Sequence, residues 1–567
     1  ALPAHILTGG IVELVERRVR RLTATERQIL EAAAVVGRRV DLSVLGEMFP
    51  GTDLRTWLMT CANAAVLDAY EGGWRFSHDK LRGHLLAVLP TAKRQSLHSQ
   101  IATVLEHLEA GRDDSEAQIG YHAEQAGDFR RAATYYSRAG DVAARRAAPS
   151  DSVAQYARAE SMLANLPITA ALRRERADLM IRQVEHSLWA ARPQDNLMRL
   201  AHAEQELAAA AVDVPPGPAD LMTLARAHFW RGRISYVGGH SPAARTSAQR
   251  ALELAKELGA VELTAKVLFL SGQLETVRGD FRRGAALLAQ CMEPLDRSGV
   301  AIEAIRARVH YAVCISACGR CVEGFAEARR AVAAAEAYGH AGLIAITHVL
   351  AAGCFFFAGD FATMEPHVTV ALAKAQQGRE PVARFLAAAI HAMMCAYGGR
   401  PEQAGPSLQL QEEILRAAGG SLLCADWFRA TQAQSVFCAG DLDLAIAQAR
   451  EVAAHCQLEE RLFAWGLTER TLAEALARKG EAADGEVDAH FAQSRAAFEL
   501  GGAELLAAHT DLAWGRECAK RGEHARAQKL LTQALAQFTA SGSLVAGRAA
   551  QQALESLGPL PAPHFAE

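Results

Sequence analysis

Gly127-Asp128-Phe129-Arg130-Arg131-Ala132 is the first copy of a pattern that recurs along most of this 567-residue chain. The pattern is a glycine with one small residue seven positions before it, here Gly120, and another five positions after it, here Ala132. From Gly239 onward, successive copies stand 40 to 42 residues apart. The nine glycines are Gly127, Gly239, Gly279, Gly319, Gly359, Gly399, Gly440, Gly480 and Gly522. A fixed period of this size predicts stacked copies of one small unit.

Two columns of small residues indicate what the repeated unit is. The column seven residues before the glycine contains Gly120, Gly232, Gly272, Ala312, Ala352, Ala392, Ala433, Ala473 and Gly515. The column five residues after it contains Ala132, Ala244, Gly284, Gly324, Ala404, Ala445, Gly485 and Ala527, and only Met364 breaks it. Small side chains at a fixed phase let two helices approach closely, and the glycine between them permits the turn. Each unit is therefore predicted to be a helical hairpin, and the fold class to be all-α.

The segment from Gly127 to Ala132 resembles the turn of the tetratricopeptide family, which also places small residues at the positions of Gly120 and Ala139. The usual period of that family is about 34 residues, and the longer units of this chain are similar to the superhelix of MalT-like transcription activators. The resemblance covers about residues 115–557. It implies a tetratricopeptide-like α-solenoid superhelix that serves as a binding scaffold, and it does not imply a ligand.

The overall charge gives no reason to expect nucleic acid or membrane as a partner. The formal net charge is −4, so no global basic field draws the chain to either surface. Residues 341–359 form an uncharged run long enough to raise the question of a membrane span. Because this run lies in phase with the other first helices, it is predicted to be a buried repeat helix. We expect a cytoplasmic protein without membrane contact.

The eleven cysteines follow no regular spacing. Cys314 and Cys354 stand at one phase of the repeat, five residues before the turn glycine, as expected for small core residues in a reducing compartment. Cys314, Cys318 and Cys321 lie close together along the sequence, but a metal site needs a fourth ligand and a loop that folds around the ion. No metal site is predicted.

The repeat does not extend into the first hundred residues, which predict a winged helix. Three helices are expected there, each opened by a capping residue: Thr23 (in a capping box with Glu26), Asp41 and Asp53. Two strands, 65–70 and 74–76, are expected to form a hairpin around Gly72-Gly73. Residues 1–110 carry 13 Lys/Arg and 12 Asp/Glu, and the third helix offers only Arg55, so direct reading of DNA is not predicted.

This block resembles the winged-helix portion of STAND signalling ATPases, in which a nucleotide-binding domain and a helical lid come first and a repeat sensor follows. Residues 11–18 resemble the connector that leaves the lid, and the chain is expected to be a fragment of a longer protein. Phe76-Ser77-His78-Asp79 resembles the Met-His-Asp-type motif of that family, with Ser77 in place of the usual methionine. The resemblance implies that His78 faces bound ADP and that Asp79 orients the local backbone.

The chemistry of His78 is compatible with that role, because an imidazole N–H can donate a hydrogen bond to a β-phosphate oxygen. The alternative is that Asp79 caps the helix that begins near Lys80 and that His78 lies at the surface. The chain itself contains neither a phosphate-binding loop nor a recognised catalytic motif. We therefore predict no enzyme activity and no cofactor for this chain, and ADP or ATP for the parent protein.

The predicted organisation has five parts. They are a connector helix from an ATPase lid over 1–22, a winged-helix domain over 23–112, irregular first helical hairpins over 113–218, regular repeats of about 40 residues over 219–557, and a proline-rich tail over 558–567. In such a superhelix the first helix of each pair lines the inner surface. Groove candidates on these helices are Trp230, Tyr236, Phe355, Phe356, His391, Met394 and Tyr397. Aromatic side chains in a groove suit a peptide, a sugar or an apolar effector, and the alternative is that they pack between helices.

Two functions remain open on this basis. The first is the regulatory sensor of a STAND-type signalling ATPase, a bacterial transcription regulator in which the superhelix binds an effector or partner protein. In that case the upstream nucleotide-binding domain is a further partner, and the winged helix couples binding to nucleotide state. The second is a stand-alone tetratricopeptide adaptor that binds partner proteins without nucleotide. Self-association is possible in either case, as for many long helical arrays.

Overall fold

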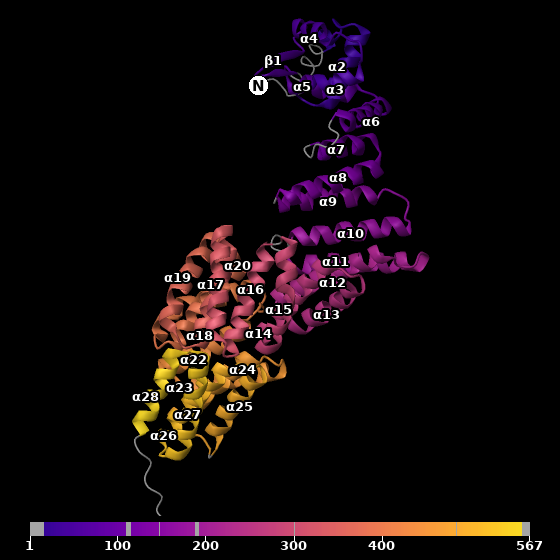
Figure 1. Cartoon of the computed structure of the whole chain (residues 1–567). Coiled ribbons are helices and arrows are strands. Elements are labelled where there is room, and N and C mark those ends of the chain that lie inside the picture. Colours follow the sequence, from indigo (N-terminus) through magenta and orange to yellow (C-terminus); the bar gives the residue numbers. More distant parts are fainter. Residues whose placement is uncertain are drawn as a thin grey trace, which may run out of the picture. The chain divides into compact units, whose positions relative to one another are not determined.

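The computed structural model describes residues 16–108, 115–146, 148–187, 192–299, 301–483 and 485–557. Over these residues the chain is helical apart from one two-stranded hairpin, which confirms the predicted all-α class (Figure 1). It divides into two compact units, Ala1–Thr223 and Leu224–Glu567, called unit 1 and unit 2 below. Residues 1–15 of the predicted connector helix and the whole predicted tail lie outside the described residues.

Unit 1 begins with the winged helix. Its elements are α2 (Ala24–Val36), α3 (Leu42–Met48), α4 (Leu54–Asn63), β1 (Leu67–Tyr70), β2 (Gly73–Phe76), α5 (Asp79–Val88) and α6 (Thr91–Leu108). The predicted capping box is present, since Glu26 N–H donates to Thr23 Oγ1 at 3.3 Å and Thr23 N–H donates to Glu26 Oε2 at 2.7 Å. The first strand begins two residues later than predicted, because Ala65 takes a left-handed backbone (φ 54°) at the end of α4 and cannot join the ladder.

Five further helices complete unit 1. They are α7 (Glu116–Ala126), α8 (Phe129–Arg145), α9 (Pro149–Leu163), α10 (Ala170–Ser187) and α11 (Pro193–Asp213), and the division between the units falls inside α12 (Pro218–Val237). Gly120 shows why the pattern needs a small residue on the first helix of a pair. A Cβ atom at Gly120 would lie 2.9 Å from the ring of Tyr136, which is fully buried on α8. The predicted domain limits within unit 1 remain predictions.

A buried histidine pair joins α6 to α7, and it makes unit 1 sensitive to acid. Nδ1 of His98 lies 2.9 Å from Nδ1 of His122, and both side chains are buried. Burial lowers the pKa of each histidine to about 4, with nearby Arg94 adding to the effect at His98 and His98 adding to it at His122. One Nδ1 must donate and the other accept, so at least one imidazole must be neutral, and burial favours the neutral form of both.

We expect the free energy of unfolding of the α6–α7 region to fall by roughly 3 kcal/mol for each of the two histidines as the pH drops from 6.5 to 4. The folded pKa lies below the value of an unfolded histidine, so the stabilisation is complete above pH 6.5 and is lost as the unfolded chain takes up protons. Native-state hydrogen exchange on the full chain at several pH values measures this loss. His122→Gln should reduce it and His107→Gln, at an exposed position on α6, should not. An unchanged loss in His122→Gln would contradict the assignment.

Unit 2 is a continuous array of helical hairpins. Its helices after α12 are α13 (Ser241–Glu257), α14 (Val261–Arg278), α15 (Phe281–Ser298), α16 (Ala301–Ala317), α17 (Cys321–Tyr338), α18 (Ala341–Phe357), α19 (Phe361–Gly378), α20 (Pro381–Tyr397), η1 (Pro401–Gln403), α21 (Gly405–Ala417), α22 (Ala425–Ala439), α23 (Leu442–Leu458), α24 (Leu462–Lys479), α25 (Glu486–Leu500), α26 (Glu504–Lys520), α27 (His524–Ser541) and α28 (Leu544–Leu557). The uncharged run 341–359 forms the buried helix α18, as predicted.

The nine turn glycines have the backbone conformation that the pattern predicts. All nine have positive φ, between 68° and 94°, where a side chain is strained. The structure adds a second set of left-handed positions where the second helix of each pair ends. This set contains Gly259, Gly299, Gly339, Arg379, Gly419, Glu460, Gly502 and Gly542. Two of these positions are occupied by Arg379 and Glu460 instead of glycine. The spacing of glycines in the sequence is therefore not enough to identify the second set of left-handed positions.

The helices of unit 2 form two layers (Figure 1). The first layer contains α12 to α19 and the second contains α22 to α28. The turns between the helices of the first layer contact the starts of helices in the second. Phe281 N–H donates to the carbonyl oxygen of Gly501 at 2.8 Å, and Leu423 N–H donates to that of Val237 at 3.0 Å. Trp427 Nε1 donates to the carbonyl oxygen of Val277 at 3.2 Å. The main hydrophobic core of unit 2 accordingly contains residues from both layers.

Candidate functional site

Residues between Phe356 and Lys520 of unit 2 line a cavity of about 500 Å³ that is open on one side. Five successive first helices line it, namely α18, α20, α22, α24 and α26, so it lies on the inner surface of the superhelix. The lining residues that carry the argument below are Phe356, Tyr397, Phe437, Arg470, Glu474 and Arg516. This volume lies within the range of small-molecule and peptide pockets.

The helical repeat determines which side chains reach the cavity. On α24 the lining residues Arg470, Glu474, Ala477 and Arg478 stand at spacings of three to four, and on a helix such residues share one face. Tyr397 and Phe437 stand two and three residues before their turn glycines, close to the position of Ala477 before Gly480. The periodic packing therefore presents the same phase of each first helix to the cavity.

Arg470 and Tyr397 lie against each other in the wall of the cavity. Arg470 is only 9% exposed, and its guanidinium carbon lies 5.6 Å from the centre of the Tyr397 ring. Among the described residues, no carboxylate lies within 4.0 Å of Arg470, and the buried hydroxyl of Tyr397 has no hydrogen-bond partner. Glu474 of the same cavity interacts electrostatically with Arg470 but forms no ion pair with it within 4.0 Å, so the guanidinium can still bind an anionic acceptor in the cavity.

The charge balance of the cavity is positive. Arg470, Arg478, Arg516 and Lys520 face it together with Glu474 and Glu517. Burial raises the pKa of Glu474 above its usual value, although Arg470, Lys520 and Arg516 oppose the effect. Burial, reinforced by Arg470, lowers the pKa of His509 to about 3, so this histidine is neutral at physiological pH. Its Nε2 lies 3.1 Å from the carbonyl oxygen of Phe357, to which it must donate.

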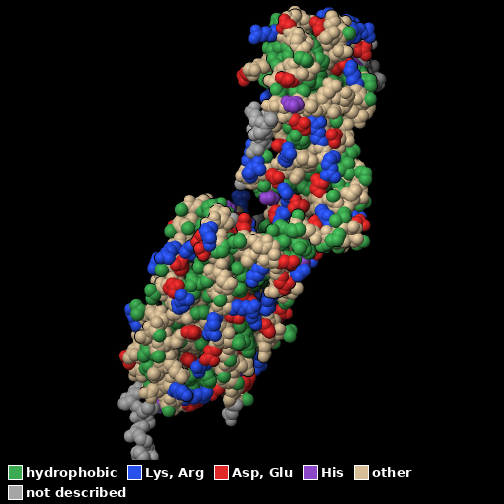
Figure 2. Space-filling model, turned by 45° about the vertical axis from the view of Figure 1, so that its right-hand side comes forward, with side chains coloured by type: hydrophobic (Ala, Val, Ile, Leu, Met, Phe, Trp, Pro, Cys, Tyr) green, Lys and Arg blue, Asp and Glu red, His purple; other side chains and the backbone are tan. Residues whose placement is uncertain are grey.

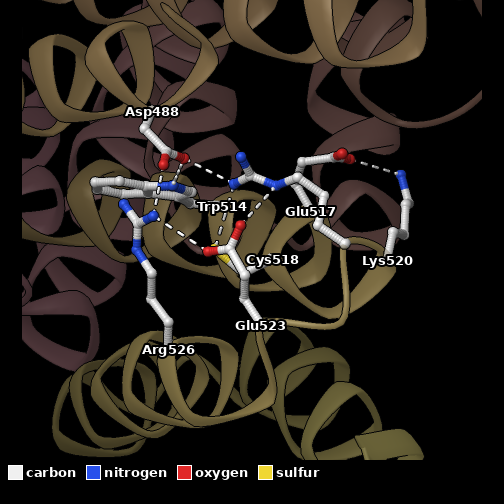
Figure 3. Close-up of polar contacts among 8 residues, drawn as sticks. Asp488, Trp514, Glu517, Cys518, Lys520, Glu523 and Arg526 are labelled. Atoms are coloured by element: carbon white, nitrogen blue, oxygen red, sulfur yellow. Dashed lines mark hydrogen bonds and ion pairs between the residues drawn. The ribbon is translucent and has the colours of Figure 1, made fainter. Parts of the chain in front are cut away.

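An ion-pair cluster around Asp488 holds together the helices that carry this wall of the cavity (Figure 3). Asp488 accepts hydrogen bonds from Trp514 Nε1 at 2.7 Å, from Arg521 at 2.7 Å and from Arg526 at 2.5 Å. Arg526 also lies 4.7 Å above the centre of the Trp514 ring. Burial raises the pKa of Asp488, but these donors outweigh it and leave the pKa below its usual value. The cluster joins α25, α26 and the start of α27.

The structure separates the seven predicted groove residues. Phe356 and Tyr397 line the cavity and contact each other edge to face at 5.4 Å. Phe355 points to another side of α18, where it stacks on Phe325 at 4.5 Å and on His367 at 5.5 Å. The remaining candidates are not among the residues that line this cavity: Met394 is buried in the core, His391 hydrogen-bonds Ser407, and Trp230 and Tyr236 belong to a cluster around α12 and α14.

His78 and Asp79 lie at the surface of the winged helix. His78 is the N-cap residue of α5, and its side chain makes no capping hydrogen bond. The alternative reading of Asp79 as the helix cap is wrong, because Asp79 is the first residue of α5 and its carboxylate pairs with Arg38 at 3.0 Å. The exposed His78 side chain is free of intramolecular contacts that would fix its direction, within the part of the chain that the structure describes.

The residues that the sequence analysis missed are the charged ones. Arg470 stands ten residues before its turn glycine, where the other repeats carry Ala117, Phe229, Phe269, Val309, Val349, Ala389, Ala430 and Leu512. A single arginine in a column of apolar residues was therefore a signal in the sequence. The groove prediction was based on unusual aromatic residues and therefore did not include Arg470.

No group of three or more His, Cys, Asp and Glu side chains among the described residues could hold a metal ion, and Cys314 instead contacts Thr276 at 3.1 Å. None of the described helices is long and apolar enough to cross a membrane. On the face that Figure 2 shows, acidic and basic side chains are interspersed, in keeping with the small net charge of −4.

Known proteins resemble this chain in fold. Neither a protein-family model nor a curated protein matches the chain. A Rap protein, solved in complex with Competence and Sporulation Factor, is 12% identical and aligns with a TM-score of 0.52 over 66% of this chain and 99% of its own. A STAND protein with a tetratricopeptide repeat sensor from Pyrococcus horikoshii is 10% identical, with a TM-score of 0.40 over 74% of this chain and 66% of its own. Yeast Tom70 is 11% identical, with a TM-score of 0.31 over 81% and 96%. The architecture is thus that of tetratricopeptide-like helical repeats.

Proposed function

We propose that the superhelix of unit 2 binds a segment of a partner protein, or a small effector, in the cavity that the first helices enclose. The observation that carries this proposal is the pair Arg470 and Tyr397. Among the described residues, the largely buried guanidinium of Arg470 has no carboxylate within 4.0 Å, and the buried hydroxyl of Tyr397 has no hydrogen-bond partner. An acidic group beside an apolar side chain would satisfy the first and pack on the aromatic rings nearby. The Rap protein, of similar fold, was solved in complex with another factor, which supports the proposal.

In this proposal the chain is the regulatory part of a STAND-type signalling ATPase that controls transcription in bacteria. Binding in the superhelix would favour one of two states of the whole protein, and the winged helix would pass this preference to the nucleotide-binding domain. The support is the order of modules in the sequence, a winged helix with a His-Asp motif followed by repeats. The exposed position of His78 leaves its imidazole available to another domain.

The cavity is tested with peptides selected on the full chain from a displayed random library. We expect the selected peptides to share an acidic residue next to an apolar one. Arg470→Ala should weaken their binding by roughly 30-fold or more, the cost of truncating one partner of a buried charge pair. Ala477→Trp, which fills the cavity, should abolish it, and Arg416→Ala on the exposed face of α21 should leave it unchanged. Selected peptides that bind both cavity variants as well as the wild type would refute the site.

The nucleotide part of the proposal has a separate test. In the protein that includes the nucleotide-binding domain, His78→Ala should weaken ADP binding and raise basal activity. Equal ADP affinity and equal activity would count against the role of His78. If the gene encodes no upstream ATPase domain, the stand-alone adaptor that binds partner proteins without nucleotide becomes the better account, and the peptide experiment still applies to it.

A further inference from the structure

A second polar cluster lies on the inner face of the first layer, outside the cavity described above. It consists of Arg233 on α12, Gln273 on α14, and Arg306 and His310 on α16. Arg233 and Gln273 stand six residues before their turn glycines, as do the cavity residues Glu474 and Arg516. Arg306 stands thirteen residues before Gly319, as the cavity residue His509 does before Gly522. The helical phase therefore turns this cluster toward the inner surface of the superhelix.

The hydrogen bonds of the cluster determine which groups donate. Arg233 Nη1 donates to Gln273 Oε1 at 3.2 Å, which fixes the orientation of the Gln273 amide. The amide nitrogen of Gln273 then donates to His310 Nε2 at 3.0 Å. Burial, together with Arg306 and Arg233, lowers the pKa of His310 to about 3, so its ring is neutral and its single proton must sit on Nδ1. Nδ1 of His310 is buried and has no partner among the described residues.

The atoms of this cluster that lack a hydrogen-bond partner among the described residues are thus all hydrogen-bond donors. Nε of Arg306 is also buried and without a partner in the described part of the chain. Neither Arg233, which is 8% exposed, nor Arg306 lies within 4.0 Å of a carboxylate of a described residue. The contact that Arg306 makes is with the face of Phe269, at 5.7 Å from the ring centre. Burial is the main cause that lowers the pKa of Arg233 to about 9, and the nearby charge of Arg306 is the second cause. The lowered pKa reflects the cost of confining two positive charges.

We propose that Arg233, Arg306 and His310 bind an oxyanion group, a phosphate or a carboxylate carried by a small molecule or a peptide. Two guanidinium groups supply charge and several N–H donors, and neutral His310 supplies one more through Nδ1. Burial lowers the pKa of Arg306, and Tyr236, Glu303 and Glu380 oppose the effect, but neither glutamate forms an ion pair with Arg306. An oxyanion would provide the acceptors that the protein does not. The Arg306 side chain as a whole is partly exposed, although its Nε is buried.

The site is tested by thermal unfolding of the full chain in sodium phosphate and in sodium acetate, each compared with sodium chloride at equal ionic strength. We expect the melting temperature to rise with anion concentration and to saturate. A rise with phosphate alone identifies a dianion site, and a rise with both anions identifies a site that also takes carboxylates. No saturable rise with either anion would overturn the proposal.

Variants separate a binding role from a structural one. Arg306→Gln and Arg233→Gln should weaken the apparent affinity for the stabilising anion by roughly 30-fold or more. Without added anion, Arg306→Gln should melt at the same temperature as the wild type or higher, because it removes a confined like charge. Arg297→Gln, at an exposed ion pair on α15, serves as the control. Wild-type affinity in Arg306→Gln, or a lower melting temperature of its anion-free form, would show that the guanidinium serves the fold alone.

Discussion

Gly279→Ala is expected to destabilise unit 2 by about 2 to 5 kcal/mol. Gly279 ends α14 with φ 94°, a left-handed conformation in which alanine is strained by roughly 1–2 kcal/mol. A Cβ atom there would also lie 2.7 Å from Cβ of Phe463 and still closer to its backbone nitrogen. The methyl group would therefore push the turn of the first layer away from the start of α24, at a further cost of about 1–3 kcal/mol.

Gly440→Ala is the matched control, because Gly440 has the same φ of 94° at the end of α22 and nothing within 4 Å of the added atom. It should cost only the backbone strain, roughly 1–2 kcal/mol. Native-state hydrogen exchange over residues 272–285 and 460–470 gives the local opening free energies of both variants. Equal losses would show that the contact between the layers contributes nothing measurable.

Phe463→Ala should cost about 3 to 5 kcal/mol, the usual range for removing a buried aromatic side chain. Phe463 is 1% exposed, and its ring meets three others from both layers: Phe281 at 5.9 Å, Phe357 at 6.1 Å and Trp427 at 4.3 Å. The cavity left by alanine would therefore lie where the layers join. We expect faster hydrogen exchange at residues 277–281, nearly two hundred positions away in sequence.

Phe491→Ala provides the comparison for this effect. Phe491 is equally buried, but its ring stacks on Trp514 of the neighbouring helix at 5.8 Å. It should lose a similar amount of stability while exchange at 277–281 stays as in the wild type. If both variants change exchange at 277–281 alike, Phe463 does not act specifically at the junction of the layers.

The hairpin architecture could be predicted from the sequence because it depends on local contacts. Gly272 and Gly515 are small because Leu288 and Leu531 of the next helix occupy the space of a side chain, at 2.6 Å and 2.8 Å from an added Cβ atom. Such contacts repeat with the period and leave a column in the sequence. The contact between the layers involves different residue types at each step, for instance Gly501 with Phe281 and Ser421 with Gly238. Because the contact between the layers leaves no repeated residue type at a fixed position of the unit, it could not be predicted from the sequence pattern.

The candidate sites were only partly predictable for a related reason. Phe355 and Phe356 are adjacent aromatic residues on one first helix, yet only Phe356 reaches the cavity. A period of 40 residues fixes the length of the repeat unit. It does not fix which face of each first helix points toward the axis of the superhelix. Arg470 differs in charge from its apolar column, but the column of Arg233 also contains Glu474 and Arg516, and that of Arg306 also contains Arg226 and Lys266. The structure was needed to show that no acidic side chain of the described residues pairs with Arg470, Arg233 or Arg306.

The stacked layers also affect how the chain folds. In an ordinary repeat array each unit contacts only its neighbours, so folding can start anywhere and spread step by step. Here hydrogen bonds and ion pairs join residues 150 to 222 positions apart, such as Trp427 with Val277 and Arg461 with Gly239. Closing loops of that length carries an entropic cost before the contacts form, and high contact order slows folding. Unit 2 should therefore nucleate locally but reach its native state in a late, cooperative step, and removal of α26 to α28 should expose the turns at Gly319 and Gly359.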